Sequence, residues 1–123
     1  MKILKFTIGF LTIALLISSC SYENMETLYP QEPGCDTVNV SYANDIQPIF
    51  NDNCTVCHSG TTPPAGFNLE DYASAVITAK SGRLLGAIKH QSGYLATPQG
   101  ANKLDDCSIN KIEAWINKSY PDN

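Results

Sequence analysis

The chain has 123 residues, in which twelve acidic side chains outnumber eight basic ones for a formal net charge of −4. This length predicts one small domain once a leader is set aside. The acidic balance argues against binding to nucleic acid and against adhesion to anionic lipid.

Residues 1–19 have the pattern of a secretory signal peptide. Two lysines give a positive start, residues 6–17 carry no charge, and small residues then lead to Cys20. The apolar run is short for a membrane span, which favours a cleaved signal over the alternative of a tilted anchor. The ending Ile17-Ser18-Ser19-Cys20 resembles the lipobox of bacterial lipoproteins. That resemblance implies that Cys20 is acylated, becomes the mature N-terminus, and holds the protein at the cell envelope, on the periplasmic face or at the outer membrane.

Residues 20–36 are polar and contain two prolines and a glycine, so we expect a flexible tether. The folded domain should then span residues 37–123. Its first helix is expected from Tyr42, with Ser41 as N-cap and with Pro48 as a kink or a limit to its length. The apolar stripe of this helix consists of Tyr42, Ile46, Ile49 and Phe50.

Cys54-Thr55-Val56-Cys57-His58 forms a C-x-x-C-H motif. Two thiols three positions apart, with a histidine directly after the second, have the spacing for covalent attachment of a c-type haem. In that chemistry Cys54 and Cys57 add across the haem vinyl groups and His58 binds the iron from the proximal side. The alternatives are a thioredoxin-like redox pair, which requires a βαβ unit around the motif, and half of a zinc site, which requires a second pair of ligands. The sequence contains neither a βαβ pattern nor a second ligand pair.

Three more helices are expected after a loop at residues 59–66. The first spans Leu69–Lys80, is capped by Asn68, and has an apolar face of Leu69, Tyr72, Ala73, Val76 and Ile77. A short helix follows over residues 83–90, and residues 91–103 are irregular. The last helix is capped by Asp105 or Asp106 and carries the stripe Ile109, Ile112, Trp115 and Ile116. No segment alternates with the period of a strand, so the expected fold class is all-α.

The five cysteines can each be given a role. Cys20 would carry lipid and the motif pair would carry haem, which leaves Cys35 and Cys107. An exported chain meets an oxidising compartment, which favours pairing these two over leaving two free thiols.

The chain from about Cys35 to Pro121 is similar to small class I c-type cytochromes, in particular the lipoprotein-borne monohaem cytochromes of the Bacteroidota. The segments that carry the resemblance are Val40 to Phe50, Cys54 to His58, Leu84 to Ile88, and Lys103 to Cys107 leading to Ile112 to Ile116. The resemblance implies a small cytochrome c-like bundle of three to five short helices around one covalent haem c. It also implies that the first and last helices cross beside the haem, that Trp115 packs there, and that Cys35 pairs with Cys107. In bacteria c-type haem is attached outside the cytoplasm, which agrees with the leader.

The sequence departs from this family on the distal side of the haem. Relatives usually bind the iron through the methionine of a Met-Pro dipeptide, and the matching residue here is Thr97. A threonine hydroxyl is a hard, weak donor and a poor partner for haem iron. The one methionine left after the leader, Met25, lies in the tether. Three states stay open: His90 as distal ligand (or else a surface or propionate-side histidine), water or no ligand, and Tyr94 or another loop group.

The function expected from these features is that of an electron carrier, not an enzyme: a membrane-tethered monohaem cytochrome that passes single electrons between exported redox partners. Its acidic surface suits a partner with a positive patch, although a merely solvated surface explains the charge equally well. The alternative is a haem sensor or small peroxidase-like protein with an open or weakly ligated distal position, but no distal Arg/His pair with peroxidase spacing stands out. A third possibility is an accessory lipoprotein in which haem is incidental or lost.

Overall fold

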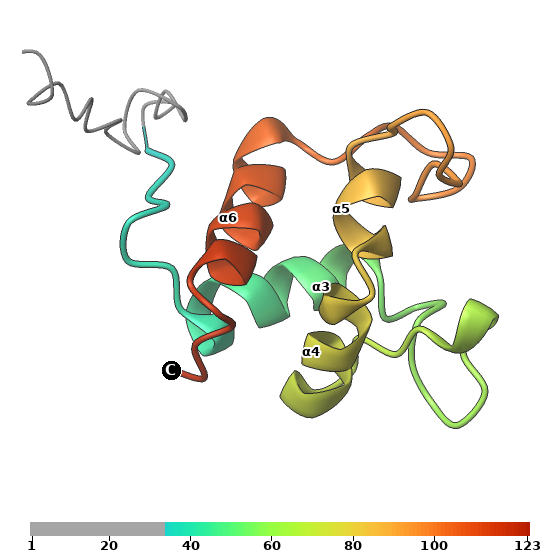
Figure 1. Cartoon of the computed structure of the whole chain (residues 1–123), viewed down its shortest axis with the longest axis horizontal. Coiled ribbons are helices and arrows are strands. Elements are labelled where there is room, and N and C mark those ends of the chain that lie inside the picture. The colour runs from blue at the N-terminus through green and yellow to red at the C-terminus, as the bar shows by residue number, and fades with distance from the viewer. Residues whose placement is uncertain (1–33) are drawn as a thin grey trace, which may run out of the picture. The chain divides into compact units, whose positions relative to one another are not determined.

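The structure is a computed structural model that describes residues 34–123. The elements run in the order η1 (Tyr42–Ile46, a π-helical turn), α3 (Gln47–Asn53), η2 (Pro64–Gly66, a 3₁₀ turn), α4 (Tyr72–Lys80), α5 (Arg83–Ile88) and α6 (Asp106–Asn117) (Figure 1). No strand occurs within this range, so the all-α class is confirmed for the described part of the chain. The leader, Cys20 and all but the end of the tether lie outside the described residues. Among the helices that are described, none has the length and apolar character to cross a membrane.

The first predicted helix is present as two consecutive elements. Ser41 caps η1, its hydroxyl accepting a hydrogen bond from the backbone N–H of Asn44 at 3.3 Å. Pro48 lies in the first turn of α3, just after the point where the π-helical turn η1 passes into the α-helix. The predicted kink or limit at this proline therefore corresponds to the junction of the two elements, and the seven-residue α3 ends directly before Cys54.

The predicted start of the second helix at Leu69 is wrong. Asn68 does not cap a helix, because its Oδ1 accepts a hydrogen bond from the N–H of Glu70 at 2.8 Å within the preceding loop. The cap is Asp71, whose Oδ1 accepts from the N–H of Ser74 at 3.0 Å, so α4 begins three residues after Leu69. Leu69 is buried, but in the loop.

The buried face of α4 also differs from the predicted one. Ala75 and Ala79 are buried, whereas Tyr72 and Val76 of the predicted face are only partly buried against the core. The predicted core residue Ile77 is 73% exposed, and Ala73 is exposed as well. The apolar periodicity predicted the wrong face because alanine, which carries little hydrophobic signal, takes two of the three buried positions of α4.

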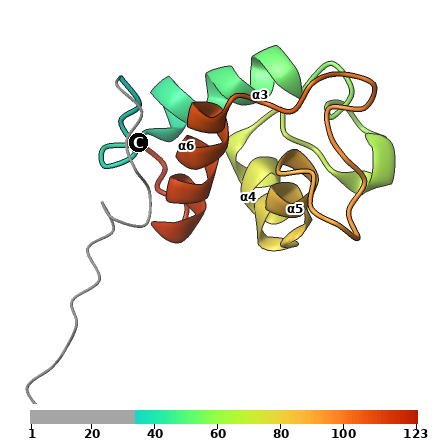
Figure 2. The ribbon, with the colours of Figure 1, turned by 90° about the horizontal axis from the view of Figure 1, so that it is seen from above.

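The core lies where α6 crosses the η1–α3 segment (Figure 2). Trp115 of α6 is fully buried, with its ring centroid 5.6 Å from that of Tyr42 and 6.2 Å from that of Phe50. The ring of Tyr120 lies edge-on to it at 5.3 Å, and the indole Nε1 donates to the carbonyl of Pro121 at 3.1 Å. The predicted stripe of α6 is confirmed, with Ile109 and Ile112 buried and Ile116 partly so.

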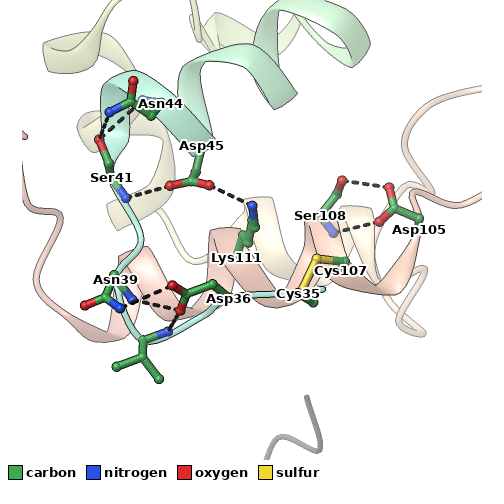
Figure 3. Close-up of polar contacts among 11 residues, drawn as sticks. Cys35, Asp36, Asn39, Ser41, Asn44, Asp45, Asp105, Cys107, Ser108 and Lys111 are labelled. Carbon is green, nitrogen blue, oxygen red and sulfur yellow. Dashed lines mark hydrogen bonds and ion pairs between the residues drawn. A yellow bond between two sulfur atoms is a disulfide. The ribbon is translucent and has the colours of Figure 1, made fainter. Parts of the chain in front are cut away.

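A disulfide joins Cys35, just before the domain, to Cys107 in the first turn of α6 (Figure 3). The sulfur atoms are 2.01 Å apart, and the bridge closes a loop of sequence separation 72. It fastens the segment that precedes η1 to the side of α6.

Removing this disulfide should lower stability without disturbing the C-x-x-C-H turn. For a loop of this length we expect Cys35→Ser/Cys107→Ser to lose about 2–4 kcal/mol of unfolding free energy, because the unfolded chain gains freedom. Both cysteines are replaced so that no new thiol can pair with Cys54 or Cys57. Denaturant unfolding of the double variant measures the loss, and the wild type under reducing conditions should match it. Equal midpoints with and without the bridge would contradict this expectation.

An ion pair of low exposure also connects η1 to α6. Lys111 Nζ lies 2.7 Å from Asp45 Oδ1, and Asp45 Oδ2 accepts from the N–H of Ser41 at 2.9 Å (Figure 3). Burial acts to raise the pKa of Asp45, but the hydrogen bonds from Lys111 and Ser41 and the charge of Lys111 together lower it below its usual value. The ionised carboxylate is therefore the form that the fold stabilises.

The stability that Asp45 contributes should be present above about pH 4 and lost as the pH falls through its lowered folded pKa. We expect Lys111→Met to cost about 1–2 kcal/mol at pH 7, between the values for exposed and fully buried pairs, and less at pH 3. Lys103→Met is the matched control, because Lys103 pairs with Asp106 on an exposed stretch and should cost under about 0.5 kcal/mol. A Lys111→Met effect that is the same at both pH values would contradict the assignment.

Candidate functional site: the C-x-x-C-H turn

The C-x-x-C-H motif forms a tight turn at the end of α3. Cys54 is the residue that follows the helix, and its N–H donates to the carbonyl of Phe50 at 2.8 Å. The carbonyl of Cys54 in turn accepts from the N–H groups of Cys57, at 3.1 Å, and His58, at 2.8 Å. The three motif side chains are therefore presented by one turn, which the N–H groups of Cys57 and His58 close on the Cys54 carbonyl.

The two thiols of this turn are unpaired but differ in environment. Cys54 is buried within the hydrophobic core, and burial raises the pKa of its thiol to about 11. Cys57 is exposed. Since the thiolate is the reactive form of cysteine, Cys54 is protected in the folded chain and Cys57 is the thiol that solvent reaches.

His58 is half-buried and already oriented. Its Nδ1 lies 2.9 Å from the carbonyl oxygen of Phe67. A carbonyl oxygen only accepts, so Nδ1 carries the proton in this contact and the lone pair of the neutral ring is on Nε2. Histidines that bind metals usually donate their other N–H to an acceptor of this kind.

The predicted distal candidates lie in and around the loop after α5. His90 is exposed, two residues past the end of α5, where its φ of +54° takes the chain out of the right-handed helix expected there. Its Nε2 lies 3.3 Å from the carbonyl of Thr97. The hydroxyl of Thr97 donates to the carbonyl of Leu95 at 3.2 Å, and its N–H donates to Ala87 at 3.1 Å. The hydrogen bonds of the candidate His90, and of Thr97 at the expected methionine position, therefore go to this loop and to α5, not to the C-x-x-C-H turn.

Tyr94 packs directly on the backbone of α5 at Gly86. A Cβ atom placed on Gly86 would lie 2.6 Å from three carbon atoms of the Tyr94 ring, so only glycine fits beneath it. Tyr94 remains 44% exposed. Gly86 is the residue that could have indicated this contact, because an isolated glycine inside a helical pattern often has a packing reason.

The other contributor that the sequence did not reveal is Phe67. Phe67 contributes its backbone carbonyl to the site. Because every residue has a backbone carbonyl, the residue type could not have indicated this contact. It becomes visible only once the loop between the motif and α4 is seen to fold back on His58.

This donor set fits a covalently attached haem. Two unpaired thiols and a histidine with a free Nε2 lie on one turn, and in the described part of the chain the remaining two cysteines are bonded to each other. No group of three or more His, Cys, Asp or Glu side chains that could hold a metal ion occurs among the described residues. A haem needs only axial ligands from the protein, because its macrocycle supplies the other four.

Comparisons with known proteins add nothing to these contacts: no family model matches the chain, and neither the curated proteins nor the solved structures include a match.

Proposed function

We propose that the protein is a monohaem c-type cytochrome that carries single electrons. The observation that carries the proposal is the state of the C-x-x-C-H turn: two unpaired thiols together with a histidine whose Nδ1 is satisfied by the Phe67 carbonyl at 2.9 Å. When bound, the haem iron supplies the one-electron couple. The finer fold, a cytochrome c-like bundle around that haem, is part of the same proposal.

The roles of the motif residues follow from their chemistry. Cys54 and Cys57 would hold the haem covalently: each thiol would add across one vinyl group, so that its S–H bond and the vinyl π bond break, one C–S and one C–H bond form, and nothing leaves. His58 would offer its Nε2 lone pair to the iron, while its Nδ1–H stays on the Phe67 carbonyl and fixes the ring. This second contact raises the basicity of the ligand and holds its orientation.

The proposed localisation is the cell envelope, where lipid on Cys20 would anchor the protein. Its proposed partners are exported or membrane redox proteins. The support is the sequence of residues 1–20. Cys20→Ala should move the protein from the membrane to the soluble exported fraction. A variant that stays with the membrane would show that the leader is an uncleaved anchor.

The central test is expression with haem-maturation machinery, followed by intact mass and a pyridine spectrum of the denatured protein. The expected result is a mass increase of one haem. Cys54→Ala and Cys57→Ala should each lose stable attachment, and His58→Ala should lose the low-spin signals. Cys35→Ser/Cys107→Ser is the matched control, because it removes the same kind of atom away from the turn and should keep its haem. A wild-type protein without covalent haem would refute the proposal.

A second candidate is a haem sensor or small peroxidase-like protein. The observation that favours it is that Thr97 and His90 are both bonded within the loop after α5, which would leave the distal position open. Rapid binding of CO to the reduced protein would support this candidate. Reversible one-electron reduction without CO binding would support the electron carrier.

A further inference from the structure

The segment between His58 and α4 forms a loop whose end is hydrogen-bonded back to the backbone of His58. The N–H of Leu69 donates to the carbonyl of His58 at 2.8 Å. The N–H of Gly60 donates to the Glu70 carboxylate at 2.9 Å, and the Asn68 side-chain amide donates to the Gly60 carbonyl at 3.0 Å. We call residues 59–70 the proximal loop. These bonds bring the Phe67 carbonyl back to the imidazole.

Two side chains from the following helices hold this loop from outside. In α4 the buried Thr78 donates its hydroxyl to the carbonyl of Asn68 at 2.8 Å. In α5 the guanidinium carbon of Arg83 lies 4.9 Å from the ring centroid of Phe67, within the range of a cation–π contact. Arg83 is the first residue of α5, so the base of its side chain is fixed by a helix and not by the loop.

We propose that Arg83 is a positioning residue for His58, acting through Phe67. The ring that Arg83 covers and the carbonyl that accepts from His58 Nδ1 belong to the same residue. Holding the ring therefore restricts rotation of the backbone that presents the carbonyl, and with it the orientation of the imidazole. The inference rests on the proposed function, in which His58 binds the iron. The competing interpretation is that Arg83 is only a solvated surface charge.

The test is a double-mutant cycle in the haem-loaded protein, using Arg83→Gln, Phe67→Leu and the two together. The readouts are hydrogen exchange of the Leu69 amide, which reports opening of the proximal loop, and the paramagnetically shifted signals of the His58 ring protons, which report ring orientation. A cation–π contact at an exposed site corresponds to a two- to fivefold faster exchange when either partner is removed. Both single variants should show this increase and should move the His58 signals.

The decisive comparison is the double variant. If Arg83 acts through Phe67, Arg83→Gln should add nothing in the Phe67→Leu background. Phe67→Tyr keeps the ring face and should behave as the wild type. Lys80→Gln is the matched control, because Lys80 carries the same charge and makes its cation–π contact with Tyr120, 5.6 Å from the ring centroid and outside the proximal loop.

The possible outcomes separate this inference from the proposed function. If the wild type carries covalent haem, and Arg83→Gln leaves both the exchange rate and the His58 signals unchanged, the positioning role is overturned while the proposed function stands. Additive effects of the two substitutions, or an equal effect of Lys80→Gln, overturn it as well. A wild-type protein that takes up no haem removes the proposed function and this inference together.

Discussion

Replacing Trp115 by alanine is expected to lower the free energy of unfolding by about 3–5 kcal/mol, the usual range for deleting a buried tryptophan. The indole has no exposed surface and is in contact with three aromatic rings, those of Tyr42, Phe50 and Tyr120. Small domains have a total stability of about 5–15 kcal/mol, so this loss is a large part of the whole. Denaturant unfolding of the variant measures it.

The same substitution should loosen the C-x-x-C-H turn. Phe50, which contacts Trp115, belongs to α3, and its carbonyl accepts the N–H of Cys54. A cavity beside Phe50 should therefore let α3 shift, and with it Cys54, the first residue of the turn. Trp115→Phe should cost less than alanine, since it keeps an aromatic ring and loses the bond from Nε1 to Pro121.

Ile77→Ala is the matched control for Trp115→Ala. Periodicity predicted Ile77 in the core, whereas the structure leaves it 73% exposed. The expected change is within about 0.5 kcal/mol, as for an ordinary surface position. A cost near that of a core residue would mean that the face of α4 is assigned wrongly, and a small cost for Trp115→Ala would contradict the central position of the indole.

These two positions show what the sequence can and cannot predict about the fold. The stripe on α6 was predictable because large apolar residues repeat there at helical spacing and an aspartate caps the helix. The face of α4 was not, because its buried residues are alanines and a threonine, while its most apolar side chain faces solvent. The start of α4 depends on which of two suitable caps binds the helix. The side chain of Asn68 is hydrogen-bonded within the loop, so Asp71 is the residue that caps α4.

The site divides in the same way. Cys54, Cys57 and His58 were predictable because their spacing is itself the requirement of the chemistry. The acceptor for His58 Nδ1 is a backbone carbonyl, and the residue that covers Phe67 lies sixteen positions further along the chain, in another helix. Contacts of this kind depend on the path of the proximal loop, which no residue pattern indicates.

Among variants that keep the haem, the largest functional effect is expected from Thr97→Met. In the proposed cytochrome, Thr97 would stand where a distal methionine is expected, and its hydroxyl is bonded to the carbonyl of Leu95. A thioether is a softer donor than a hydroxyl and favours haem iron. We therefore expect the wild type to lack the sulfur-to-iron band at the red end of the oxidised spectrum, and the variant to gain it.

The same variant should raise the reduction potential, on the order of 100 mV, because methionine ligation raises the potential and axial ligands move it over a range of about 0.8 V. At 59 mV for each factor of ten, this changes a one-electron equilibrium about fiftyfold. Spectroelectrochemical titration measures the shift. Thr97→Val, which removes the hydroxyl without supplying sulfur, is the control and should leave the red band absent.

The backbone of position 97 is suited to this substitution. Its N–H donates to Ala87 at the end of α5 and its carbonyl lies beside His90 Nε2, so the new side chain would start from a point fixed to a helix. His90→Ala distinguishes the remaining distal states: a change from low to high spin would identify His90 as the wild-type ligand, and an unchanged spectrum would exclude it. A sulfur band already present in the wild type would mean that Met25, of the same or a second molecule, supplies the ligand, and would contradict the argument from Thr97.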